Sequence, residues 1–272
     1  MDRYIIFLDI DGTLVGGADF PFGGSVSEGN KNAIKKAREA GHYVFLNTGR
    51  SYAWIQPKVI EELEFDGVIS GVGTQAVMGD KILYEHPIEK QALEKIYRAF
   101  EGSEHSVLFG APGNIYVLNP SGFLDNPKLT FIRSGEDFYE KCLKDKIQKV
   151  EIFETELLGT ERSVGEVVTA EQLASMTENL CTYCHGWYME GFPEGCSKAK
   201  AMRITAEKLG IPPKRTIAVG DSVNDADMLA AAGIAVAMGN AVPQLKDSAD
   251  FVTLDCEQDG VAYAIEQLLF NQ

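Results

Sequence analysis

Short apolar segments alternate with amphipathic ones along the first part of the chain. Three of the apolar segments have the length and composition of strands buried on both faces: residues 4–8, 43–47 and 66–70. Residues 27–30 supply helix-capping side chains, residues 31–40 have helical character, and Gly41 is a typical helix stop. Residues 54–63 predict a second helix. This strand–helix–strand–helix–strand order predicts a parallel sheet with right-handed crossovers.

The pattern changes between about residues 81 and 189, where apolar and polar positions alternate more often. Strand-like segments occupy residues 107–109, 114–118 and 164–168, and helical patterns lie at residues 91–100 and 171–179. A mixture of this kind is typical of an α+β domain with an antiparallel sheet.

The last part of the chain returns to the alternation of the first part. Helices are predicted at residues 198–209 and 226–232, and strands at residues 216–219, 234–237 and 251–253. The pattern therefore predicts an α/β fold: a doubly wound, Rossmann-like parallel-sheet core with an inserted α+β domain. We place the core at residues 1–81 and 192–272, and the insert at residues 82–191.

The composition is that of a globular protein with an acidic surface. The 272 residues are 45% hydrophobic and 24% charged, which suits one large domain or two smaller ones with apolar cores. A net charge of −15 repels phosphate backbones and argues against nucleic acid as a partner. No apolar stretch is long enough for a bilayer, and residues 1–3 lack the basic start of a signal peptide, so we expect a cytoplasmic protein without a membrane partner.

The five cysteines fit that compartment as reduced thiols. Cys181, Cys184 and His185 match the C-x-x-C-H pattern of haem attachment. The same residues are half of a zinc site, but the sequence offers no second Cys/His pair of suitable spacing. Since there is no export signal, we interpret the match as chance, and haem absorbance or stoichiometric zinc in the purified protein would contradict this.

Carboxylates collect where the first predicted strand ends. Asp9 and Asp11 follow residues 4–8, and Gly12 and Thr13 then turn the chain. Ligands of a parallel sheet bind beyond the carboxyl ends of its strands, and two acids there can bind a cation, act as a nucleophile or transfer a proton. Taken alone, the segment is better explained as an ordinary Asp-Gly turn.

Three later segments supply what such a site would lack. Thr48 and Gly49 follow the second strand, Lys198 opens a predicted helix, and residues 220–225 follow another strand. Each has a plain interpretation as a turn, a surface residue or a helix cap. Together they form a set for phosphoryl transfer: a nucleophile, a proton-transfer acid, a hydroxyl donor, a cation and a metal ligand.

These segments resemble the four ordered motifs of the haloacid dehalogenase (HAD) superfamily: residues 9–14 (DIDGTL), 48–50 (TGR), Lys198 and 220–229 (GDSVNDADML). The last motif is especially similar to that of the Cof-type phosphatases, which carry a large α/β cap between the second and third motifs. The resemblance covers both core segments, and over the cap it rests on position and size. It implies an Mg²⁺-dependent phosphatase that hydrolyses small phosphomonoesters, such as sugar phosphates or phosphorylated cofactors, through an aspartyl-phosphate.

The resemblance also implies a role for each motif residue. Asp9 is the nucleophile, and Asp11 is the general acid that later activates water. Mg²⁺ is held by the carboxylates of Asp9 and Asp221 and by the backbone carbonyl of Asp11. Lys198 neutralises the nucleophile and the phosphoryl group. Gly12, Thr48 and the backbone amide of Gly49 bind phosphate. Asn224 orients phosphate or the metal's surroundings, and Asp225 supports the loop and Lys198.

Elementary electrostatics agrees with this assignment. An Asp9 anion that attacks an anionic ester is repelled, and a divalent cation together with one ammonium offsets much of that repulsion. Mg²⁺ prefers hard oxygen ligands, which this segment offers.

Two positions depart from the family pattern. Ala199 follows the lysine where Cof-type chains usually have Gly, and residues 72–74 (VGT) stand where an Asn-Gly-Ala stretch is common. Within the cap, two interpretations stay open for four residues, which are candidate substrate contacts or members of the cap core: Asn114, Tyr116, Trp187 and Tyr188. A phosphomutase or a dedicated sugar-phosphate phosphatase would share every core residue. A catalytically silent metabolite-binding regulator is the alternative from another class.

Overall fold

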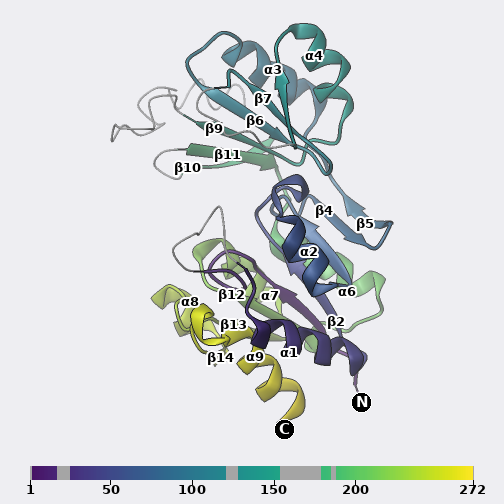
Figure 1. Cartoon of the computed structure of the whole chain (residues 1–272), viewed down its shortest axis with the longest axis vertical. Helices are drawn as coiled ribbons and strands as arrows, with labels where there is room; N and C mark the ends of the chain where they lie inside the picture. Colours follow the sequence, from purple (N-terminus) through teal and green to yellow (C-terminus); the bar gives the residue numbers. More distant parts are fainter. Residues whose placement is uncertain (1, 17–24, 121–127, 154–178, 185–187, 272) are drawn as a thin grey trace. The chain divides into compact units, whose positions relative to one another are not determined.

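The structure is a computed structural model, and it describes residues 2–16, 25–120, 128–153, 179–184 and 188–271. These residues form two compact units. Unit 1 comprises Met1–Gly49, Ile55–Glu85 and Ser197–Gln272, and unit 2 comprises Arg50–Trp54 and His86–Cys196. Each unit has its own sheet (Figure 1). Within the described residues, no helix is long and apolar enough to cross a membrane.

Unit 1 is built on an eight-stranded sheet. Its strands are β1 (Ile5–Leu8), β2 (Tyr43–Asn47), β3 (Gly67–Ser70), β4 (Gln75–Met78), β5 (Lys81–Glu85), β12 (Thr216–Gly220), β13 (Ile234–Ala237) and β14 (Phe251–Val252). Their order is β14-β13-β12-β1-β2-β3-β4-β5, with parallel pairs from β14 to β3 and antiparallel pairs from β3 to β5. The predicted parallel core is confirmed, and the β4–β5 hairpin is an addition that the hydrophobic pattern did not indicate.

Helices cover both faces of this sheet. The described helices of unit 1 are α1 (Glu28–Glu39), α2 (Pro57–Leu63), α6 (Lys198–Lys208), α7 (Ala226–Ala231), α8 (Pro243–Ser248) and α9 (Gly260–Ile265). α1 packs against α2 and α9, whereas α6 packs against α7. The β1–α1–β2 and β12–α7–β13 connections leave the centre of the sheet in opposite directions, so right-handed crossovers place α1 and α7 on opposite faces. The core is therefore doubly wound, as predicted.

Local chemistry explains where α1 begins and ends. The Ser27 hydroxyl accepts a hydrogen bond from the Asn30 amide at 3.2 Å, which caps the first turn. The buried face of the helix includes Ala33, Ile34 and Ala37, at the spacing of an amphipathic helix. The helix predicted over residues 54–63 is shorter than expected, because a 3-10 turn at Tyr52–Trp54 precedes it and α2 starts only at Pro57.

The centre of the sheet fixes the position of the candidate chemistry. All four residues of β1 are fully buried, and β1 pairs in parallel with both β2 and β12. Parallel strands end at one edge of a sheet, so the residues that follow β1, β2 and β12 come together there. Those residues are Asp9, Thr48 and Asp221.

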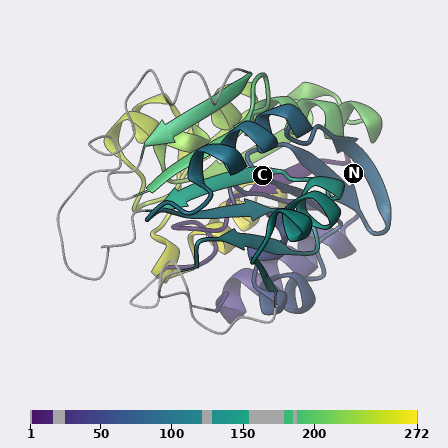
Figure 2. The same cartoon turned by 90° about the horizontal axis from the view of Figure 1, so that it is seen from above.

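Unit 2 contains a six-stranded sheet that shares one apolar core with the described α-helices of the unit (Figure 2). Its described elements are α3 (Lys90–Phe100), β6 (Ser106–Gly110), β7 (Ile115–Leu118), β8 (Leu129–Ile132), α4 (Gly135–Glu140), β9 (Lys149–Phe153), β10 (Leu180–Cys184) and β11 (Tyr188–Pro193). The order is β10-β11-β9-β6-β7-β8, and all pairs except β7–β8 are antiparallel. The predicted strand at residues 164–168 and most of the predicted helix at residues 171–179 lie outside the described residues.

Aromatic side chains from the two helices fill the core of unit 2. Tyr97 of α3 stacks on Phe138 of α4 with ring centroids 4.1 Å apart, and Phe138 also packs against Phe109. Tyr116 belongs to this core, which favours its structural interpretation. Tyr188 stacks on a neighbouring strand residue, Phe153.

The C-x-x-C-H segment coincides with an edge strand. Cys181 lies in β10 and is a free thiol, and β10 is the outermost strand of its sheet. His185 and Trp187 lie outside the described residues.

Candidate active site

The turn after β1 is shaped around Asp221. Asp9 is buried directly after the strand, and Gly12 has a positive φ of 77°. A Cβ atom on Gly12 would lie 2.2 Å from Oδ2 of Asp221, so only glycine fits this turn. The hydroxyl of buried Thr13 donates to Oδ1 of Asp221 at 3.1 Å. The first and fourth motifs are thus locked together.

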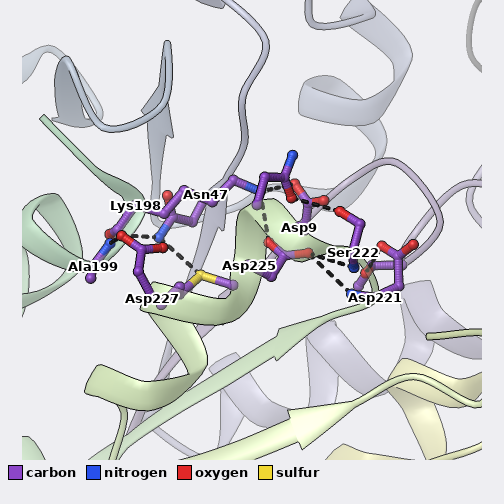
Figure 3. A network of polar contacts seen from close by, with 11 residues as sticks. Asp9, Asn47, Lys198, Ala199, Asp221, Ser222, Asp225 and Asp227 are labelled. Carbon is purple, nitrogen blue, oxygen red and sulfur yellow. Dashed lines mark hydrogen bonds and ion pairs between the residues drawn. The ribbon is translucent and has the colours of Figure 1, made fainter. Parts of the chain in front are cut away.

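Lys198 is the cation at the centre of the site. It is the first residue of α6, and its side chain is completely buried. The ammonium lies 2.9 Å from Oδ1 of Asp9 and 2.7 Å from Oδ1 of Asp225 (Figure 3). A lysine so deeply buried is rare unless it is paired, and here it joins two carboxylates from distant parts of the chain.

Asp225 organises the loop that follows β12. Its Oδ2 accepts hydrogen bonds from the backbone amides of Asp221 at 3.1 Å and Ser222 at 3.2 Å. Its Oδ1 holds Lys198, so both carboxylate oxygens are engaged. The side chain therefore fixes the loop that carries Asp221 and the lysine at the same time.

The second motif lies beside the fourth. Thr48 is fully buried directly after β2, and its amide donates to the carbonyl of Ile69 at 3.0 Å. A Cβ atom built on Gly49 would lie 4.0 Å from Nδ2 of Asn224 and 3.9 Å from the Val72 side chain. Gly49 is thus close to Asn224.

Burial and mutual repulsion raise the pKa values of the carboxyl groups of Asp9 and Asp221. Burial raises the pKa of Asp9 well above its ordinary value, the Asp225 carboxylate raises it further, and Lys198 opposes both by charge and hydrogen bonding. Burial, and then Asp225, raise the pKa of Asp221 to about 6. Burial alone would lower the pKa of Lys198, but Asp225 and Asp9 outweigh it and raise that pKa. The site therefore holds more negative charge than one ammonium neutralises.

That excess charge fits a divalent cation. Oxygen atoms of Asp9, Asp221 and Asp225 lie within 4.8 Å of one another. Carboxylate oxygens are hard donors of the kind that Mg²⁺ prefers. Because Asp225 already uses both oxygens, Asp9 and Asp221 are the members of this cluster best suited to bind a metal.

The chain matches the model of one family, described as haloacid dehalogenase-like hydrolase, over residues 6–265. The chain belongs to the haloacid dehalogenase-like hydrolases. The resemblance of its motifs to that superfamily is thereby confirmed.

Three relatives of this haloacid dehalogenase-like hydrolase are similar along almost their whole lengths. YkrA of Bacillus subtilis (strain 168) is 30% identical, with 98% of each chain covered. The same organism's 5-amino-6-(5-phospho-D-ribitylamino)uracil phosphatase YcsE is 26% identical, covering 97% of this chain and 95% of YcsE. A solved haloacid dehalogenase-like hydrolase from B. subtilis is 26% identical, with a TM-score of 0.78 and coverage of 98% and 100%.

The structure of this haloacid dehalogenase-like hydrolase also shows residues that the motif comparison did not assign. Thr13 orients Asp221, and Asn240 bridges the turn after β1 by donating to the Gly12 carbonyl at 2.8 Å and accepting from the Cys256 amide at 3.0 Å. Asn47 contacts the backbone of Lys198. A sequence signal existed for Asn47, since it is a polar residue that ends an otherwise apolar strand.

Proposed function

We propose that this chain is an Mg²⁺-dependent phosphatase that hydrolyses small phosphomonoesters through an aspartyl-phosphate on Asp9. The observation that carries the proposal is the ammonium of Lys198 between Asp9 and Asp225, beside Asp221. A nucleophilic carboxylate needs neighbouring positive charge to approach an anionic ester, and this arrangement supplies it.

Asp9 performs the covalent step. A carboxylate oxygen of Asp9 forms a bond to phosphorus while the bond from phosphorus to the leaving oxygen breaks, and Asp11 gives its proton to that oxygen. In the second step Asp11 takes a proton from water, the water oxygen bonds to phosphorus, and the Asp9–phosphorus linkage breaks. Together the two steps return Asp9 and Asp11 to their starting protonation states, and inorganic phosphate leaves.

The other site residues hold charge and geometry. Lys198 stabilises the carboxylate and the equatorial phosphoryl oxygens, and the Thr48 hydroxyl and Gly49 amide bind the phosphate. Asp9, Asp221 and the Asp11 carbonyl would hold Mg²⁺. When bound, Mg²⁺ supplies positive charge that lowers repulsion between the nucleophile and the phosphate.

The substrate class follows from relatives and from charge. YcsE is named as a phosphatase of a phosphorylated ribityl compound, a small phosphomonoester on a polyol chain. A net charge of −15 disfavours polyanionic polymers as substrates. We therefore assign sugar phosphates and phosphorylated small cofactors as the class to test.

The test is phosphate release from a panel of such esters, with Mg²⁺ and then with EDTA. We expect turnover that EDTA stops and Mg²⁺ restores, and a loss of about 10³-fold or more in Asp9→Asn. Borohydride reduction during turnover should convert phosphorylated Asp9 to homoserine, detectable by peptide mass spectrometry.

Asp247→Asn is the matched control, because Asp247 is an exposed carboxylate on helix α8 of the same unit. It should retain normal turnover. Wild-type activity in Asp9→Asn, or full activity after exhaustive chelation, would contradict the nucleophile or the metal assignment respectively. Binding of esters without hydrolysis across the panel would instead support the silent regulator.

A further inference from the structure

Asn47 is an amide buried in a place that favours apolar side chains. It is the last residue of β2, the other described members of that strand's interior are apolar, and its exposure is 0%. Its Nδ2 donates to the backbone carbonyl of Lys198 at 3.1 Å and lies 3.1 Å from the sulfur of Met228 (Figure 3). The amide therefore joins the strand of the second motif to the residue that forms the third.

This amide is not placed for maximum stability. Among the described residues its Oδ1 has no hydrogen-bond partner, although the atom is buried. A buried acceptor without a donor is unfavourable, and a small apolar residue would avoid that loss. Residues that break a local rule in this way are concentrated at functional sites.

The hydrogen bond from Asn47 reaches the first residue of α6, and the backbone there sets the position of the Lys198 side chain. α6 begins at Lys198, and its N-cap, Ser197, accepts from the Lys200 amide at 3.1 Å. Gly73 approaches the same end so closely that a Cβ on it would lie 2.1 Å from the Ser197 carbonyl. Asn47 thus donates to the carbonyl of Lys198, and Gly73 lies close to the carbonyl of the residue before it.

A small movement of this helix start would disturb both ion pairs of the lysine. The ammonium contacts Asp9 and Asp225 at 2.9 and 2.7 Å, and both contacts depend on where the backbone of residue 198 lies. Displacements of about 1 Å in a catalytic group can reduce turnover about 100-fold.

We propose that Asn47 is a positioning residue that acts through Lys198: its amide fixes the start of α6 so that the ammonium reaches the nucleophile. This inference rests on the proposed function, and it concerns a residue outside the four motifs. Asn47 touches neither substrate nor reacting atoms in this role.

The test measures Asn47→Ala, Lys198→Met and the double variant with a fluorogenic phosphate ester. We expect Asn47→Ala to lower kcat about 10- to 100-fold while KM changes less than about threefold, since ground-state phosphate contacts remain. On the Lys198→Met background, Asn47→Ala should have little further effect on kcat, because the residue it positions is gone. Asn47→Ser, which keeps a donor, should recover part of the rate.

Thr205→Val is the control for general loosening of α6. Thr205 is fully buried on the same helix, and its hydroxyl has no partner among the described residues. It should leave kcat unchanged. An unchanged kcat in Asn47→Ala, or losses that simply multiply in the double variant, would overturn the positioning role. If Asn47→Ala does not fold, the same comparison of kcat values is made with Asn47→Ser, alone and combined with Lys198→Met. A wild-type protein without hydrolysis would refute the proposed function instead.

Discussion

Replacing Lys198 by Met removes the buried cation while keeping a side chain of similar length. The ammonium makes two contacts, at 2.9 Å to Asp9 and 2.7 Å to Asp225, with no exposed surface. At an effective dielectric constant of about 20, each contact contributes roughly 6 kcal/mol of attraction before desolvation. Desolvation of the ions offsets much of this, and removal of one partner of a buried pair typically costs about 3–5 kcal/mol.

We therefore expect Lys198→Met to lower the free energy of unfolding by about 3–5 kcal/mol at pH 8 in EDTA. For a chain of this size that corresponds to a fall in Tm of roughly 6–20 °C. Denaturant unfolding followed by circular dichroism measures the first quantity, and calorimetry the second. Lys200→Met is the matched control, because Lys200 is exposed two residues along the same helix.

The loss should also depend on pH. Lys198 lowers the pKa of Asp9, so its removal raises that pKa further. A carboxyl group whose pKa is higher in the folded state stabilises the fold at low pH, and that stabilisation disappears as pH rises through the raised pKa. The deficit of Lys198→Met should accordingly be smaller at pH 5 than at pH 8. A variant within about 1 kcal/mol of the parent at pH 8, or a deficit that grows on acidification, would refute this reasoning.

Three further predictions follow from single residues. Because burial raises the pKa of Asp221 to about 6, Mg²⁺ affinity measured by calorimetric titration should fall as pH drops from 7.5 to 5, and a constant affinity would contradict it. Burial and then Arg3 lower the pKa of His42, whose Nδ1 accepts from the Tyr4 amide at 3.0 Å. The stabilisation from neutral His42 should therefore be fully present above about pH 6.5, and Tm should fall as the pH drops below that value. The fall should be smaller in His42→Asn, which keeps a hydrogen-bond acceptor but does not titrate. Equal acid sensitivity of Tm in both proteins would count against this. Val72 has a φ of 57°, which Asn tolerates far better than a β-branched residue, so Val72→Asn should raise unfolding stability by about 1 kcal/mol, whereas Val72→Ile should not.

The strands that carry the site could be predicted because strands buried on both faces consist almost entirely of apolar residues. β1 and β12 are short apolar runs between turn residues, and both formed where expected. The β4–β5 hairpin escaped prediction because its burial is mixed: Ala76 is fully buried whereas Ile82 is 54% exposed. An edge hairpin of this kind lacks both the continuous apolar run of a buried strand and a strict alternation.

Contacts between distant backbone segments could not be predicted in the same way. The motif residues have recognisable sequence spacing, and the structure does bring Asp9, Lys198, Asp221 and Asp225 together. Asn47 stands out in the sequence as a polar end to an apolar strand, but its partner, the carbonyl of Lys198 151 residues later, is known only from the structure. Hydrogen bonds to backbone carbonyls carry no signature in the partner's side chain, so sequence reasoning has nothing to match.

The site as a whole opposes the stability of its own fold. Asp9 and Asp221 are held with raised pKa values, Asn47 buries an acceptor without a donor, and Val72 has a strained backbone beside Gly49. Each feature is unfavourable in the metal-free protein, yet all of them surround one point at the carboxyl edge of the sheet. The surrounding strands can tolerate this because β1 is completely buried and paired on both sides. Because a bound cation relieves the carboxylate repulsion but not the strain at Val72, Mg²⁺ should stabilise the parent and Val72→Asn by the same amount, and the two effects on Tm should add.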